Sequence, residues 1–256
     1  MMSIRYLPVR MTLLAFTYFL AIDLSSIAMA PKWAEDSLFD YVANVQWGGS
    51  MGVDALLLGV LPLLALVLPR LMDRFENHLV VVRIQDKGKV FDQLIALSVY
   101  MAALLTLVMA ATGIVVSLLA TGRMSNLWGS HVGTLYFLLE NKTYFPIYVP
   151  HVTSIKIWIY LLSSRFVVIL FMAVFILFLK IVLKKNIFVF FLSLFLFAGD
   201  GLISERFPLL LERVRITMDT WVSPTDQWFQ VIYFILGITI FYFLSIRFYK
   251  NKEFYH

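Results

Sequence analysis

Several residue types that carry chemistry are absent or scarce in this chain of 256 residues. Cysteine is absent, which excludes disulfides and thiolate metal ligands. The four histidines show no i, i+4 pair and no adjacent carboxylate cluster, so we expect no metal site and no other cofactor. No G-x-x-x-x-G-K-[ST] motif occurs, so the chain cannot hold ATP in a standard phosphate-binding loop.

Charge is also scarce, and apolar residues dominate. Only 14% of the residues are charged, 61% are hydrophobic and the mean hydropathy is +0.85, whereas a soluble domain is about a quarter charged. Six apolar runs approach or exceed the roughly 20 residues needed to cross a bilayer. They are residues 11–30, 53–72, 93–120, 160–183, 187–204 and 228–246. The sequence therefore predicts an all-α, polytopic membrane protein in which residues 1–256 form one transmembrane domain.

Two of the runs leave alternatives open. Arg5 and Arg10, followed by an apolar run and "AMA" at 28–30, are typical of a signal peptide. Pro31 is a poor residue after a cleavage site, and the run is long enough to span, so we favour an uncleaved helix. The fourth run begins either at Phe166 or at Ile157, and the earlier start would place Arg165 inside it, reaching toward the interface.

The distribution of basic residues predicts the orientation. With the N- and C-termini in the cytoplasm, the inner side carries 13 of the 21 Lys and Arg residues but five of the 16 acids, as the positive-inside rule requires. All six tryptophans then fall on the outer side, in keeping with their preference for the headgroup zone. We expect parts of the outer connections 31–52, 121–156 and 205–227 to be amphipathic helices on the outer surface. The positive charges are scattered between apolar runs, so the expected partner is the lipid bilayer and not nucleic acid.

A charged segment separates the second and third runs. Residues 73–92, which include "VVVRIQDKGKV" at 80–90, have an apolar centre and charged ends. Such a segment can lie along the inner membrane face or dock in a groove of another protein. An ordinary solvated loop is the alternative.

This layout of six spans, with a basic segment before the third and a surface helix before the sixth, resembles the ABC-2 type permeases. The closest likeness is to small bacterial members associated with export of, or immunity to, antimicrobial peptides. The resemblance implies a multi-pass subunit of the bacterial cell (plasma) membrane that is not itself an enzyme. It would work as a permease homodimer or heterodimer with a separate ABC ATPase subunit, and would export a peptide or amphipathic compound, or give immunity to one.

The same resemblance makes residues 73–92 the coupling segment that docks on the ATPase. It implies apolar anchors at Leu79, Val80 and Val81, and polar contacts from Arg83, Asp86 and Lys87. The long outer connections depart from the family pattern and leave the substrate open. A stand-alone membrane immunity or interaction protein without an ATPase is the alternative function.

Two further features bear on function. "GGSMG" at 48–52 matches the G-x-S-x-G nucleophile elbow, but no strand is expected before it, so we interpret it as a flexible turn into the second span. An intramembrane enzyme using Ser50 is a third hypothesis. Asp23, Asp54 and Asp200 lie within or at the rim of spans, where charge is costly. They could line an acidic outer vestibule for a cationic peptide, or could be hydrated at the interface.

Overall fold

The computed structural model describes residues 9–30, 36–44, 48–76, 87–203 and 211–251, and within these ranges the regular structure is entirely helical. The long helices are α1 (Val9–Met29), α3 (Leu61–Phe75), α5 (Lys87–Thr121), α8 (Ser154–Leu183), α9 (Asn186–Ile203) and α12 (Pro224–Lys250). Short helices are α2 (Leu38–Val42), α6 (Thr134–Leu138), α7 (Phe145–Tyr148), α10 (Leu211–Val214) and α11 (Met218–Val222). A π-helical stretch (Ala55–Val60) leads into α3, and a 3₁₀ turn (Lys142–Tyr144) leads into α7.

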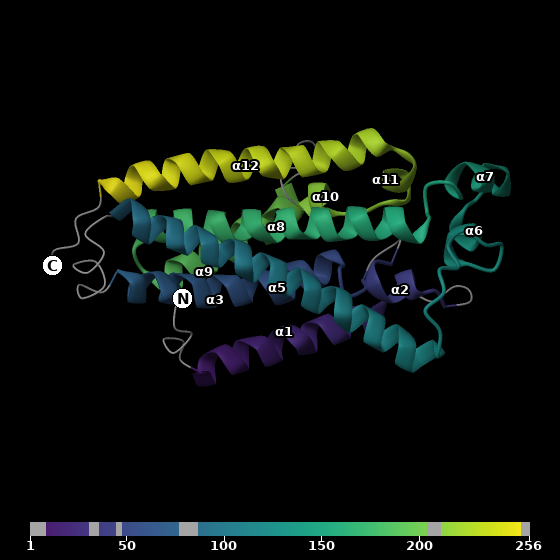
Figure 1. Cartoon of the computed structure of the whole chain (residues 1–256), viewed down its shortest axis with the longest axis horizontal. Helices are drawn as coiled ribbons and strands as arrows, with labels where there is room; N and C mark the ends of the chain where they lie inside the picture. The colour runs from purple at the N-terminus through teal and green to yellow at the C-terminus, as the bar shows by residue number, and fades with distance from the viewer. Residues whose placement is uncertain (1–8, 31–35, 45–47, 77–86, 204–210, 252–256) are drawn as a thin grey trace.

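The long helices form a bundle with α8 at its centre. Helix α8 packs against α3, α5, α9 and α12, and α1 lies on the opposite side against the π-helical stretch, α3 and α5 (Figure 1). Side chains from α8, α9 and α12 fill the middle of the bundle with stacked and edge-on phenylalanines, including Phe171, Phe175, Phe197 and Phe241. A buried aromatic layer of this kind supplies both apolar area and favourable ring geometry.

Four of the described helical stretches are long and apolar enough to cross a membrane: Ala55–Phe75, Gly88–Thr121, Ser154–Leu183 and Pro224–Lys250. The first and fifth predicted spans are also apolar helices. Their described apolar stretches, Leu13–Met29 and Asn186–Gly199, are shorter than the four above. The expectation of an all-helical fold with several helices able to span a membrane is therefore confirmed, and six crossings with both termini in the cytoplasm stay a prediction. Helix α8 starts at Ser154, which agrees better with the Ile157 start of the fourth run than with the Phe166 start.

The helix ends have identifiable stop and start signals. Gly122 follows α5 in a left-handed conformation (φ +65°), and its N–H donates to the Leu118 carbonyl at 2.9 Å, as glycine does after many helices. Helix α12 starts with Pro224 at its first position, and the Ser223 side chain accepts a hydrogen bond from the Asp226 N–H. These signals fix where two of the longest helices end and begin.

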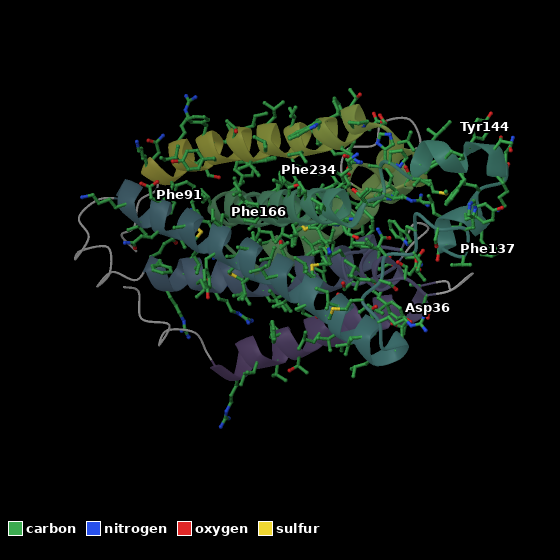
Figure 2. All side chains as sticks on the ribbon, turned by 45° about the vertical axis from the view of Figure 1, so that its right-hand side comes forward. Asp36, Phe91, Phe137, Tyr144, Phe166 and Phe234 are labelled. Carbon is green, nitrogen blue, oxygen red and sulfur yellow. The ribbon has the colours of Figure 1, made fainter. Side chains whose placement is uncertain are left out.

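The two ends of the bundle differ in structure. At one end, which we call the Asp73 end, α3 finishes, α5 begins, α8 turns into α9 and α12 finishes (Figure 1). At the other end lies a cap, which we define as residues 36–44, 122–153 and 218–222 and which contains α2, α6, α7 and α11. Figure 2 shows the separation: Phe91 lies near the Asp73 end, whereas Phe137 and Tyr144 lie in the cap.

Candidate functional site

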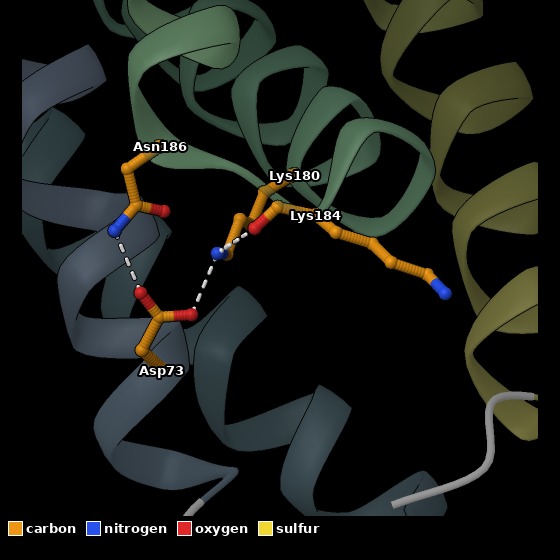
Figure 3. Close-up of polar contacts among 4 residues, drawn as sticks. All are labelled: Asp73, Lys180, Lys184 and Asn186. Atoms are coloured by element: carbon orange, nitrogen blue, oxygen red, sulfur yellow. Dashed lines mark hydrogen bonds and ion pairs between the residues drawn. The ribbon is translucent and has the colours of Figure 1, made fainter. Parts of the chain in front are cut away.

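A polar network joins three helices at the Asp73 end (Figure 3). The Lys180 Nζ atom of α8 lies 2.6 Å from Asp73 Oδ1 of α3, and the Asn186 side-chain amide of α9 donates to Asp73 Oδ2 at 2.7 Å. The same ammonium group donates to the Lys184 carbonyl in the α8–α9 turn. Lys180 is buried whereas Asp73 is 44% exposed, so the carboxylate compensates a charge that would otherwise be costly to bury.

Aromatic packing attaches the start of α5 to the end of α12. The Phe91 ring is fully buried, and its centroid lies 5.4 Å from that of Tyr249 and 5.8 Å from that of Tyr242. The last turn of α3 is held by the Asp73 network and the first turns of α5 by this ring cluster. Both flanks of residues 77–86 are thus attached to the bundle.

Most of the predicted coupling residues lie outside the described residues. These are Leu79, Val80, Val81, Arg83 and Asp86, while Lys87 is the first residue of α5. The predicted segment, 73–92, stays a prediction; within it, α3 continues to Phe75 and α5 already begins at Lys87, so helical residues flank 77–86. The apolar residues Val90 and Phe91 explain the earlier start, because both are buried against neighbouring helices.

The cap is organised around the buried carboxylate of Asp40. Its Oδ2 atom accepts hydrogen bonds from the Ser37 N–H (2.9 Å) and the Thr134 hydroxyl (2.8 Å), and its Oδ1 accepts from Trp128 Nε1–H (2.8 Å). Burial raises the pKa of the Asp40 carboxyl above its ordinary value, and these three donors oppose the rise. One side chain therefore links the 36–44 segment to residues almost a hundred positions later.

A cluster of aromatic side chains lies around the Asp40 hydrogen-bond hub, which comprises Asp40 and its donors Ser37, Trp128 and Thr134. The Phe39 ring contacts Trp128 and Trp158 with centroids 5.6 and 5.4 Å apart, and Trp221 bridges Trp128 and Tyr160 at 5.5 Å from each. Three tryptophans assigned to one side of the membrane are thus at the same end of the molecule. Trp128 and Trp221 are buried in protein, whereas Trp228 at the start of α12 is largely exposed.

The helix that contains the fourth run includes Arg165, as the earlier start required, and the Arg165 side chain is bound inside the protein. It lies in the interior of α8, is 2% exposed, and its Nη1 group donates to the Val214 carbonyl at 2.8 Å. Val214 ends the short helix α10, whose last carbonyls have no partner within the helix and so provide an acceptor. Sequence reasoning missed this pairing because the two residues are 49 positions apart.

The three predicted vestibule acids have different environments. Asp23, on α1, has no exposed surface, and Asp54, just before the π-helical stretch, is exposed. Asp200 belongs to α9, but its side chain is outside the described set. The vestibule stays a prediction. Asp23 is buried inside the protein, whereas a vestibule residue would face the solvent.

The 48–52 turn is confirmed as a glycine turn. Gly48 and Gly49 have φ values of +79° and +85°, which L side chains rarely adopt. Ser50 is buried, and its hydroxyl has no hydrogen-bond partner among the described residues, so nothing there would activate it as a nucleophile. His131, in the cap, packs against the Tyr136 and Phe145 rings.

No group of three or more His, Cys, Asp or Glu side chains within the described ranges could hold a metal ion. Comparisons of the chain with protein families, with characterised proteins and with solved structures gave no match. The functional conclusion therefore depends on the geometry of the helices and on the charge pattern of the sequence.

Proposed function

We propose that this protein is the membrane-spanning permease subunit of an ATP-driven exporter, acting on a peptide or amphipathic compound or giving immunity to one. The observation that carries the proposal is α5, a single helix of 35 residues. At 1.5 Å per residue it is about 52 Å long, well beyond the roughly 30 Å of bilayer hydrocarbon. It begins next to residues 77–86 and reaches the cap, where it packs against α2.

Such a helix suits mechanical coupling. ATP hydrolysis occurs in the cytoplasm and substrate movement in the bilayer, so a stiff element must connect the two. In the proposal, a separate ATPase subunit binds residues 77–86, with Leu79, Val80 and Val81 as apolar anchors and Arg83, Asp86 and Lys87 as polar contacts. A displacement there passes to α5 directly, and to α8 and α12 through Lys180 and Phe91.

The sequence has no phosphate-binding loop, so the proposal requires a partner chain, and we propose two permease copies per transporter. Helix α12 offers a surface where a second permease copy could bind. Most of the apolar stretch of this helix is not buried inside the protein, and either lipid or another permease chain could cover it.

The test is co-purification of the full-length chain with an ATPase from its native membrane. We expect the wild-type protein to retain a subunit that carries a phosphate-binding loop, together with vanadate-sensitive ATP hydrolysis. Arg83→Glu should lose both. The matched control is Arg247→Glu, an equal charge reversal at an exposed position near the end of α12 on the same predicted side, and it should retain both.

The stand-alone immunity protein predicts a different result. Scrambling residues 79–86 with the charges retained would then leave resistance to the antimicrobial peptide unchanged, and no ATPase would co-purify with the wild-type chain. Either finding would refute the permease proposal, as would labelling that places residues 77–86 outside the cell.

A further inference from the structure

A polar seam runs between α1, α5 and the 48–52 turn, inside an otherwise apolar part of the bundle. Asp23 lies on α1 six residues before Met29, about 9 Å from that helix end. Its side chain is completely buried, and neither carboxyl oxygen has a hydrogen-bond partner among the described residues. Buried polar groups nearly always have partners, so this carboxyl needs an explanation.

Specific contacts assemble the seam. The Ser26 hydroxyl donates to the Gly49 carbonyl at 3.0 Å, and the Gly49 N–H donates back to the Ser26 carbonyl at 3.2 Å. On α5, Gly113 lets the turn approach so closely that a Cβ there would collide with Ser50 Oγ. Asp23 and Ser26 are three residues apart and share a face of α1.

Other hydroxyl groups lie on the elements that form this seam. Thr112, adjacent to Gly113, is a described side chain that interacts with the carboxyl, but its O–H is donated to the Val108 carbonyl at 2.8 Å, which leaves no direct hydrogen bond to Asp23. The Thr112 oxygen can therefore still accept a hydrogen bond. Ser50 and Ser117 are buried, with hydroxyls that have no partner among the described residues. Ser117 lies four residues beyond Gly113 on α5, one turn nearer the cap.

No described cation compensates a negative charge at Asp23. The π-helical stretch, α3 and α5 are the elements that pack against α1. Several charged or titratable side chains of α1 and these elements are described, and none of them forms a hydrogen bond or ion pair with the Asp23 carboxyl: Arg10, Tyr18, Asp54, Arg70, Asp73, Arg74, Lys89, Asp92 and Tyr100. A lone carboxylate in an apolar site is strongly disfavoured, so the neutral acid is the form that this site accommodates.

We propose that Asp23 is an intramembrane proton-binding site, whose carboxyl exchanges its proton with the cap side through the hydroxyls of Ser50 and Ser117. The step is a protonation: hydronium gives one proton to the carboxylate and leaves as water. A neutral carboxyl can donate its O–H to the Thr112 oxygen, which the carboxylate cannot do. A proton needs one oxygen, whereas a metal cation would need several ligands converging on one point. The proposal is independent of any ATPase.

The test uses dicyclohexylcarbodiimide on the full-length protein in lipid vesicles. This apolar reagent adds the O–H of a protonated carboxyl across one of its C=N bonds, and no co-reactant is needed. We expect the peptide that contains Asp23 to gain the mass of one reagent molecule at acid pH. Above the range in which the carboxyl ionises, the rate of labelling should fall about tenfold per pH unit.

Matched variants make the result specific. Asp23→Asn keeps the shape and should abolish labelling of this peptide, whereas Asp54→Asn should leave it unchanged. After a pH jump, Ser50→Ala combined with Ser117→Ala should slow the change in Asp23 labelling while leaving its value at equilibrium the same.

Three outcomes would overturn the proposal. These are an unlabelled Asp23 in the wild-type protein at every pH, labelling that does not change with pH, or protection by sodium ions at constant pH, which would assign the seam to a metal cation. An equal rate after the pH jump in the double serine variant would refute the proton path.

Discussion

Replacing Asp40 by alanine is the sharpest test of how the cap is held together. The substitution removes the one acceptor shared by Ser37, Trp128 and Thr134. The Thr134 hydroxyl can rotate to another acceptor, but the Ser37 N–H and the Trp128 indole N–H are fixed by their surroundings. Both donors would remain buried without partners.

The expected cost follows from those two donors. Each buried, unpaired donor costs about 1–3 kcal/mol, which gives about 2–6 kcal/mol for both. Relief from burying the Asp40 carboxylate offsets part of this, so we expect a net loss of about 3 kcal/mol of local stability. At 1.4 kcal/mol per factor of ten, the amides of the cap should exchange with solvent about 100-fold faster.

Amide hydrogen exchange of residues 122–138 measures this directly. Asp40→Asn is the intermediate case, because its single carbonyl oxygen cannot replace two oxygens that accept from different directions. Glu140→Ala, which removes an exposed carboxylate of the cap, is the control and should exchange like the wild type. Equal protection in Asp40→Ala and Glu140→Ala would refute the view that this hydrogen-bond hub stabilises the cap.

The remaining predictions concern pH and the packing of the bundle. Because the folded-state pKa of Asp40 is raised, its contribution to stability is complete below the unfolded pKa and is lost as pH rises through the folded one. Lowering the pH from neutral should therefore increase protection of the cap, after correction for intrinsic exchange, and Asp40→Asn should remove that increase. Asp73→Ala should lower the melting temperature in detergent by leaving the Lys180 ammonium uncompensated; Asp73 is partly exposed, so the loss should be about 1 kcal/mol, and Lys180→Met should be milder. Gly113→Ala should cost about 1–3 kcal/mol by overpacking, because its Cβ would meet Ser50 and lie 2.8 Å from Val42 Cγ2; an unchanged melting temperature would contradict the close approach of α5 to the turn.

The features that the sequence predicted well are those that depend on local composition. Runs of apolar residues predicted the long helices, and the glycines of "GGSMG" predicted the turn that the structure shows there. Boundaries were less accurate where tertiary contacts decide them. In the sequence, Phe91 lies within a charged segment. In the structure it belongs to α5, and its ring packs against Tyr249 of α12.

The residues that sequence reasoning missed are those whose partners are distant in the chain. Nothing near Asp40 indicates that its carboxylate will bind Trp128, 88 positions away. Likewise, no residue near Arg165 in the sequence indicates that its guanidinium will donate to the Val214 carbonyl. Burial of a polar group in these places depends on which helices meet, and that is a property of the whole bundle.

Helix α8 is the most apolar of the four helical stretches that are long enough to cross a membrane: its most apolar 18-residue stretch has a mean hydropathy of 3.1, and 72% of that stretch is buried inside the protein. Inside the finished bundle, apolar side chains on most faces of α8 match the helices that pack around it. During synthesis, however, α8 leaves the ribosome before α9 and α12 exist, and lipid must solvate the faces that they later cover. We therefore expect polar substitutions on the α12-facing side of α8 to lower the amount of protein inserted into the membrane more than they lower the melting temperature of the assembled protein.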